Sequence, residues 1–156
     1  VKVVRTMPNM PALIGEGITA VCKGKNASAQ DVRTVCDILS GIGQSVVVKE
    51  NLMDAITAIS GSGPAYVFLF VECFVNAAES LGLSPAHAKD LVYKTLTGSA
   101  HLLEKASDDA AALRAKVTSK GGTTQAAMDV FWAHQIEKIF KDALTAARNR
   151  ARELVK

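Results

Sequence analysis

The arrangement of hydrophobic and polar residues changes near residue 50, from short runs to longer helical stripes. In the first part, β-branched and other apolar residues gather in short runs bounded by glycine and proline, which is typical of strands. The pattern predicts strands over residues 1–7, 17–21 and 45–48. Pro8 and Pro11 should end the first of them, because proline cannot donate to a sheet ladder.

One helix is predicted between the second and third strands, over residues 29–40. Its apolar residues follow the i, i+3, i+4, i+7 spacing of a helix face, namely Val32, Val35, Cys36 and Leu39. Ser28 is the expected N-cap, and Gly41 or Gly43 is the expected stop. Three short strands form a weak sheet by themselves, and the chain starts inside a strand without an initiator methionine. We therefore expect residues 1–50 to be the last part of a larger sheet domain.

Every element after residue 50 is predicted to be helical. Helices are expected over residues 52–59, 65–81, 85–105, 125–131 and 135–154, with a further short one capped by Asp108 and ending near residue 117. The segment 60–64 is expected to be a loop, with Pro64 at the first position of the next helix. Polar side chains occupy only one narrow face of residues 65–81, so that helix should be buried on several sides. We expect this apolar surface to be buried in an interface between copies of the chain, in a homo-oligomer.

Composition narrows the class of protein. A chain of 156 residues has room for one domain, or for one domain and part of another. A net charge of +3 and an aromatic content of 5% argue against a nucleic-acid-binding surface. The longest apolar run, 65–71, is much shorter than the about 20 residues that a membrane helix needs, and no signal peptide is recognisable. We expect no nucleic acid and no membrane among the partners.

The cysteines and histidines do not suggest a metal site, because neither set shows a zinc-ligand spacing. Cys22, Cys36 and Cys73 are instead expected to be buried thiols of a protein in a reducing compartment, which indicates a cytoplasmic location. The glycines at 41 and 43 follow a predicted helix and lack a third glycine, so they do not form a dinucleotide fingerprint.

One segment has the character of a binding site: residues 118–124, TSKGGTT, which precede a predicted helix. Its two glycines allow a tight turn with positive φ, and the threonines that follow can cap the helix with their hydroxyl groups. Because a helix N-terminus presents unpaired backbone N–H groups, a small carboxylate would be well held there. The alternative is a glycine turn and a capped helix without a ligand.

Four motifs together resemble the successive signatures of the Δ1-pyrroline-5-carboxylate reductases. They are RTMPNMP at 5–11, GEG at 15–17, SGSGPAY at 60–66 and TSKGGTT at 118–124. The resemblance implies a mainly α fold, in which residues 1–50 are the end of a truncated Rossmann-like NAD(P)-binding domain. Residues 51–156 would then be an all-helical dimerisation and substrate-binding domain. Family members form homodimers that often assemble further into decamers.

The resemblance also implies an activity and a set of site residues. The family reduces pyrroline-5-carboxylate to L-proline with NADPH or NADH, the last step of proline biosynthesis. The substrate carboxylate would be held by five residues, Ser119, Gly121, Gly122, Thr123 and Thr124, and the Thr124 hydroxyl would meet the ring nitrogen as the catalytic group. Met7, Pro8 and Asn9 would lie at the nicotinamide end of the cofactor, which is NADP or NAD.

Two features of this chain depart from the pattern of an intact family member, and two other functions remain as alternatives. This chain alone is expected to be inactive, because it lacks the phosphate-binding fingerprint. Lys120 stands where many family members have proline, and its charge is expected to steer the anionic substrate. The alternatives are a helical oligomerisation module without catalytic role, and the substrate domain of another dehydrogenase of the same architecture.

Overall fold

The computed structural model describes residues 1–154, whose contacts gather in two compact units. The first unit consists of Val1–Val67 together with the chain from Phe140 onward, and the second is Phe68–Ile139. A three-stranded sheet and several helices make up the described residues, so the expected mainly α fold with a small α/β part is confirmed.

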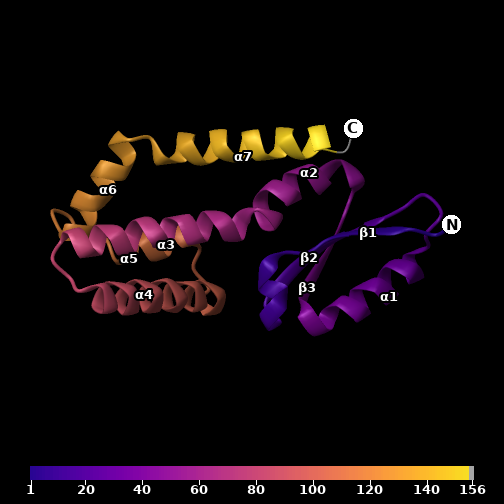
Figure 1. The fold of residues 1–156 in the computed structure, drawn as a ribbon, viewed down its shortest axis with the longest axis horizontal. Helices are drawn as coiled ribbons and strands as arrows, with labels where there is room; N and C mark the ends of the chain where they lie inside the picture. Colours follow the sequence, from indigo (N-terminus) through magenta and orange to yellow (C-terminus); the bar gives the residue numbers. More distant parts are fainter. Residues whose placement is uncertain (155–156) are drawn as a thin grey trace. The chain divides into compact units, whose positions relative to one another are not determined.

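The sheet of the first unit contains β1 (Val4–Met7), β2 (Gly17–Lys23) and β3 (Gly43–Val48) in that order. β1 pairs antiparallel with β2, and β2 pairs parallel with β3 (Figure 1). The helix α1 (Ala29–Leu39) connects the parallel pair, as a crossover connection must. All three predicted strands are confirmed, with bounds that move by a few residues.

Short 3₁₀ turns join several of these elements. They span Met10–Ile14, Ser40–Ile42 and Glu50–Leu52. The second of them ends α1, and Gly43 follows it with a φ of 138°. A Cβ at Gly43 would lie 2.0 Å from the carbonyl oxygen of Gly17, so glycine is required where β3 starts beside β2.

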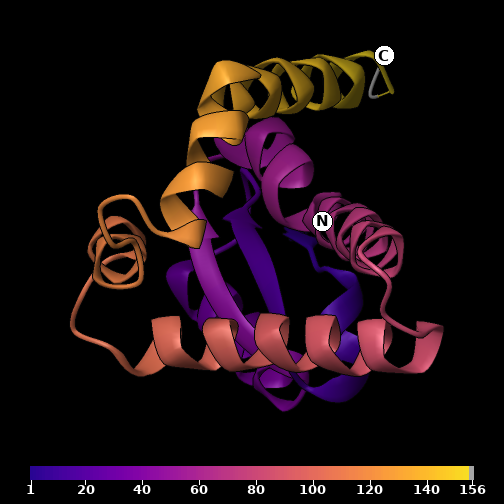
Figure 2. The same cartoon turned by 90° about the vertical axis from the view of Figure 1, so that its left-hand side faces the viewer.

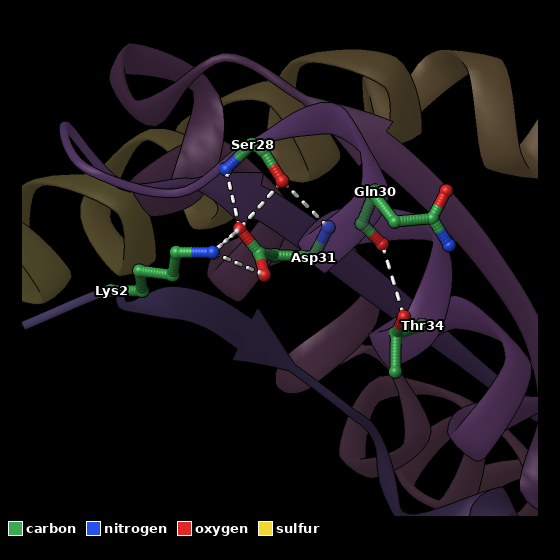
Figure 3. Close-up of polar contacts among 5 residues, drawn as sticks. All are labelled: Lys2, Ser28, Gln30, Asp31 and Thr34. Atoms are coloured by element: carbon green, nitrogen blue, oxygen red, sulfur yellow. Dashed lines mark hydrogen bonds and ion pairs between the residues drawn. The ribbon is translucent and has the colours of Figure 1, made fainter.

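The predicted N-cap of α1 is confirmed. The Asp31 N–H donates to the Ser28 hydroxyl at 3.1 Å, and the Ser28 N–H donates to the Asp31 carboxylate at 2.7 Å, which is a capping box (Figure 3). Lys2 reaches the same carboxylate at 3.2 Å. Hydrogen bonds from Ser28, and then from Lys2, lower the pKa of Asp31 to about 2. One turn further along, the Thr34 hydroxyl donates to the Gln30 carbonyl at 3.1 Å.

The core of the first unit lies around β2. The side chains of successive β2 residues point to opposite faces of the sheet, and α1 and α2 (Met53–Ile56) each contact β2, from opposite sides (Figure 1). Ala20 and Cys22 form a buried cluster with Met53, whose exposed fraction is 0%. The half-buried side chains packed against this cluster are Met7, Val48 and Ile56.

The prediction of a loop at residues 60–64 is wrong. The chain continues from α2 through a π-helical turn, Thr57–Gly61, into α3 (Gly63–Ser80). The Ser62 N–H donates to the Thr57 carbonyl at 2.9 Å, which is the i to i+5 bond of a π-turn. Pro64 is the second residue of α3, in the first turn where proline is tolerated. The sequence signal for a break therefore marks a change in helix winding.

The second unit contains most of α3 with α4 (Pro85–Lys105), α5 (Ala110–Lys116) and α6 (Thr123–Ala133). Figure 2 shows α4 running across the view while α3 is seen nearly end-on, so the two helices cross. Three buried residues make their contact, with Val71 and Val75 packed against them: Ala78, Ala88 and Val92. The last helix, α7 (Ile136–Leu154), follows Gln135, whose φ of 53° separates it from α6.

Two capping predictions have different outcomes in this unit. Ser84 caps α4 by accepting a hydrogen bond from the His87 N–H at 3.3 Å, as expected. Asp108 does not cap α5, because Asp109 accepts from the Ala112 N–H at 2.8 Å instead. The Asp108 carboxylate pairs with Lys116 at 2.5 Å.

Two expectations about burial are wrong for the chain as it stands. The apolar side chains of α3 are largely exposed, at 56% for Phe68, 59% for Leu69 and 51% for Phe70. Of the three free cysteines, only Cys22 is buried, while Cys73 on α3 is exposed. The continuous helical stretch Glu50–Ser80 is long and apolar enough to cross a membrane, by length and composition alone. A large apolar surface on α3 is therefore left uncovered by the residues that the structure describes.

Candidate functional site

The turn that precedes α6 is built by glycine. The Gly122 N–H donates to the Ser119 carbonyl at 3.0 Å, so residues 119–122 form a β-turn. Gly121 is its third residue and has a φ of 73°, which is the type II arrangement. Lys120 occupies the exposed second position. Of the two glycines, only Gly121 has the positive φ that the sequence allowed for both.

Gly122 is favoured for a different reason. Its φ is −82°, but a Cβ there would lie 2.3 Å from the Ser119 hydroxyl and 3.1 Å from the Ser119 carbonyl oxygen. A side chain at residue 122 would therefore displace the Ser119 hydroxyl and crowd the backbone of the turn that leads into α6. The two glycines together hold the 119–122 turn closed against the first residue of the helix.

The N-terminus of α6 presents unpaired donors. Gly122 is the N-cap, and it has no side chain to cap the helix, so the prediction that the threonines cap it is wrong. Within residues 1–154, no hydrogen bond is formed by the N–H groups of Thr123, Thr124 and Gln125, as expected for the first residues of an uncapped helix. The half-buried Thr124 hydroxyl likewise has no partner among the described residues. This arrangement can accept an anion and one further polar atom.

The start of the 118–124 segment is bonded to the end of α5, and a pair of side chains joins α5 to α6. The Thr118 hydroxyl donates to the Arg114 carbonyl at 2.7 Å, in the last turn of α5. The Arg114 guanidinium lies over the ring of Trp132 in α6, 5.9 Å from its centroid, a cation–π contact. No short-range pattern in the sequence signals the contact between Arg114 and Trp132, which are 18 positions apart.

The residues expected at the nicotinamide end of the cofactor lie in the first unit, where β1 ends. Met7 is half-buried, and Pro8 after it is exposed. Asn9 accepts a hydrogen bond from the Ile18 N–H at 3.0 Å through its side-chain oxygen. The Asn9 side chain thus joins the segment after β1 to the start of β2 and fixes the backbone there.

An ion pair with partly exposed side chains lies beside the buried Cys22 thiol of the first unit's core. Arg5 on β1 forms an ion pair with Glu50. In the β1–β2 register, Arg5 lies directly opposite Cys22. Burial, and then the carboxylate of Glu50, raises the pKa of the Cys22 thiol. The Cys22 thiol and the Arg5 guanidinium lower the pKa of Glu50. A raised pKa keeps the thiol protonated, so Cys22 has the character of a structural cysteine.

Metal-binding geometry is not present within residues 1–154, where no group of three or more His, Cys, Asp or Glu side chains could hold an ion. The chemistry that the described residues do offer is hydrogen bonding at the α6 N-terminus and a fixed backbone turn after β1.

Comparison with known proteins gives consistent results. The family described as "Pyrroline-5-carboxylate reductase dimerisation" matches residues 50–154. The chain is 40% identical over 154 residues to a pyrroline-5-carboxylate reductase of Corynebacterium melassecola, covering 99% of this chain and 57% of that protein. It is 40% identical over 169 residues to one of Mycobacterium tuberculosis strain H37Rv, covering 97% of this chain and 57% of that protein.

Solved structures agree with these relatives. The Plasmodium falciparum pyrroline carboxylate reductase crystal structure with NADP bound has a TM-score of 0.93 and 35% identity, covering 99% of this chain and 62% of that one. A Coxiella burnetii pyrroline-5-carboxylate reductase has a TM-score of 0.93 and 37% identity, covering 98% and 57%. The chain thus spans about 57% of the length of the relatives that it matches.

Proposed function

Since the chain belongs to the pyrroline-5-carboxylate reductase dimerisation family, we propose that it is the dimerisation and substrate-binding part of an enzyme that reduces Δ1-pyrroline-5-carboxylate to L-proline. The observation that carries this proposal is the 118–124 segment, where unpaired N–H groups and the free Thr124 hydroxyl meet at one helix terminus. An anionic ring with one polar nitrogen has the two features that such a terminus can bind.

The substrate carboxylate accepts hydrogen bonds from the backbone N–H groups of Thr123 and Thr124. Ser119, Gly121 and Gly122 shape the turn that leaves these groups open. Hydrogen bonds to a charged group contribute about 1.5 to 3 kcal/mol each, so two of them are enough to orient a small ring. The Thr124 hydroxyl then hydrogen-bonds to the ring nitrogen.

The reaction needs positioning more than acid–base chemistry. The nicotinamide cofactor, NADPH or NADH, supplies a hydride when bound. In that reduction the C=N bond of the protonated imine would become a single bond, and the ring nitrogen would keep its proton. The residues of this chain orient the ring at Thr124 and line the nicotinamide end with Met7, Pro8 and Asn9. Their fit to that end is supported by the backbone that Asn9 fixes after β1. The chain has no glycine-rich dinucleotide fingerprint.

We further propose that a second copy of the chain covers the exposed apolar surface in a homodimer. The support is the family's dimerisation character and a groove of about 670 Å³ between α3 and α4. Apolar and aromatic side chains make up most of its lining, including Phe68, Val71, Val75, Tyr93 and Leu96. Burial by a second copy accounts for the apolar face of the stretch Glu50–Ser80, and no membrane is needed to cover it. Sedimentation of the protein at several concentrations tests it, and a monomer at all of them contradicts it.

Free cysteines and the proposed biosynthetic role both support a cytoplasmic location, which we include in the proposal. Fractionation of cells expressing the full-length protein tests this part.

The test of the activity is oxidation of NADPH and of NADH by the full-length protein in the presence of pyrroline-5-carboxylate. Turnover that requires this substrate supports the proposal. If neither cofactor is oxidised, the proposal is contradicted, and an oligomerisation module without catalytic role becomes the better interpretation. A separate measurement on this chain alone, thermal stabilisation by L-proline, distinguishes the two interpretations at the level of binding.

A further inference from the structure

The SGSGPAY motif, residues 60–66, has no part in the proposed function, although its first two residues belong to the π-helical turn of the first unit. π-Helical turns are rare and occur frequently at functional sites. The hydroxyl groups of this turn are occupied by the helix itself. Thr57 donates to the Met53 carbonyl at 2.8 Å, and Ser60 donates to the Ile56 carbonyl at 3.2 Å. Among the glycines of the motif, one lies against a side chain that is distant in sequence.

Gly61 makes room for Met7. A Cβ at Gly61 would lie 2.5 Å from the Met7 Cε methyl, a distance that real contacts do not allow. The φ of Gly61 is not positive, so its backbone conformation does not demand glycine. Gly63, in the same motif, has no atom within 4 Å of such a Cβ. A Cβ at Gly61 would meet the Met7 side chain and, in ordinary contact at 3.8 Å, the Thr57 methyl group, whereas a Cβ at Gly63 would meet neither.

Met7 cannot move away freely on its other sides. It is paired with Ala20 at the end of β1, and its side chain packs against the buried cluster of Ala20, Cys22 and Met53. Its backbone is followed by Pro8 and by Asn9, whose side chain is bonded to the Ile18 N–H. Since a methionine side chain is flexible, a methyl group at residue 61 would displace its terminal part first.

We propose that Gly61 is a positioning residue for the nicotinamide cofactor, which acts by leaving the space in which the tip of Met7 is seated. The inference rests on the proposed function, in which Met7 lines the nicotinamide end. It adds to that function a residue from a distant motif that does not itself need to touch the cofactor.

The experiment compares Gly61→Ala with the matched control Gly63→Ala in the full-length protein. The readouts are the Kd of NADPH from its fluorescence, the KM values of cofactor and of pyrroline-5-carboxylate, and Tm. We expect Gly61→Ala to raise the Kd and KM of the cofactor about fivefold or more, while the KM of pyrroline-5-carboxylate stays within about twofold. Gly63→Ala should leave all four readouts near their wild-type values, because its new methyl group meets open space.

A double-variant cycle separates positioning from a general effect on the helix. In a Met7→Ala background the added methyl group meets no side chain, so Gly61→Ala should change the Kd of the cofactor no further. The same background keeps the test decisive if Gly61→Ala alone fails to fold, because the double variant removes the collision. An unchanged cofactor Kd in Gly61→Ala, equal effects at residues 61 and 63, or an effect that persists in the Met7→Ala background would overturn the inference. If the wild-type protein does not oxidise either cofactor with pyrroline-5-carboxylate, the proposed function itself has failed.

Discussion

Removing the Thr124 hydroxyl should reduce activity and leave the fold intact. In the structure this hydroxyl forms no hydrogen bond with the described residues, and Gly122, not a threonine, is the N-cap of α6. Thr124→Ala therefore removes no cap, and we expect the free energy of unfolding to change by no more than about 0.5 kcal/mol. A hydrogen bond to the charged ring nitrogen is worth about 1.5 to 3 kcal/mol. Its loss corresponds to a decrease in kcat/KM of roughly 10- to 150-fold.

The assay is NADPH oxidation by the full-length protein, with thermal unfolding and sedimentation as checks on fold and assembly. Thr124→Ser is the matched variant, because it keeps a hydroxyl group at the same helical position and should recover most of the activity. A Thr124→Ala variant with wild-type kcat/KM would refute the role of the hydroxyl. A variant that loses stability in proportion to its activity would show that Thr124 is a structural residue.

Three further predictions concern the turn before α6 and the cap of α1. Gly121→Ala places a Cβ at a φ of 73° and should destabilise the second unit by about 1 to 2 kcal/mol, whereas Gly121→Asn should cost less; equal Tm values for both variants would contradict this. Lys120→Ala should lower kcat/KM a few-fold at low ionic strength and have no effect at about 1 M salt, since salt screens an exposed charge. If the variant and the wild type show the same salt dependence of kcat/KM, Lys120 does not steer the substrate. The pKa of Asp31 is lowered from 3.8 to about 2, so its contribution to stability is present above pH 3.8 and is lost as the pH falls through about 2. Asp31→Asn should therefore flatten the acid limb of the unfolding curve in that window, and an identical acid limb in the variant would show that the cap contributes nothing there.

Local signals in the sequence predicted most elements correctly. The strands of the first unit, the capping box at Ser28 and the cap at Ser84 depend on residues within a few positions of one another. Such features need only the period of the apolar residues and the hydrogen-bonding capacity of a short side chain. The four motifs also predicted the family, because they occur together and in order along the whole chain.

The errors occur where two local solutions are nearly equivalent. Asp108 and Asp109 are both good N-caps, and the contact of Asp108 with Lys116 leaves Asp109 to cap α5. Gly121 and Gly122 both permit a turn, but only Gly121 takes the positive φ. Gly, Ser and Pro at 60–64 are typical of a loop, yet packing of Met7 at Gly61 accompanies a π-turn that keeps the helix continuous.

The sequence by itself determined the elements, the family and the residue types available for a carboxylate and a ring nitrogen, because each of these depends on neighbours along the chain. Only the tertiary structure decided which donors remain unpaired at the start of α6, and that the tip of Met7 occupies the space left by Gly61. It also revealed that α3 keeps its aromatic side chains exposed. The Met7 contact and the exposure of α3 depend on residues far apart in sequence, which close packing brings together or leaves apart. The open donors of α6 depend on which of two adjacent glycines takes the positive φ, and local pattern alone does not decide that.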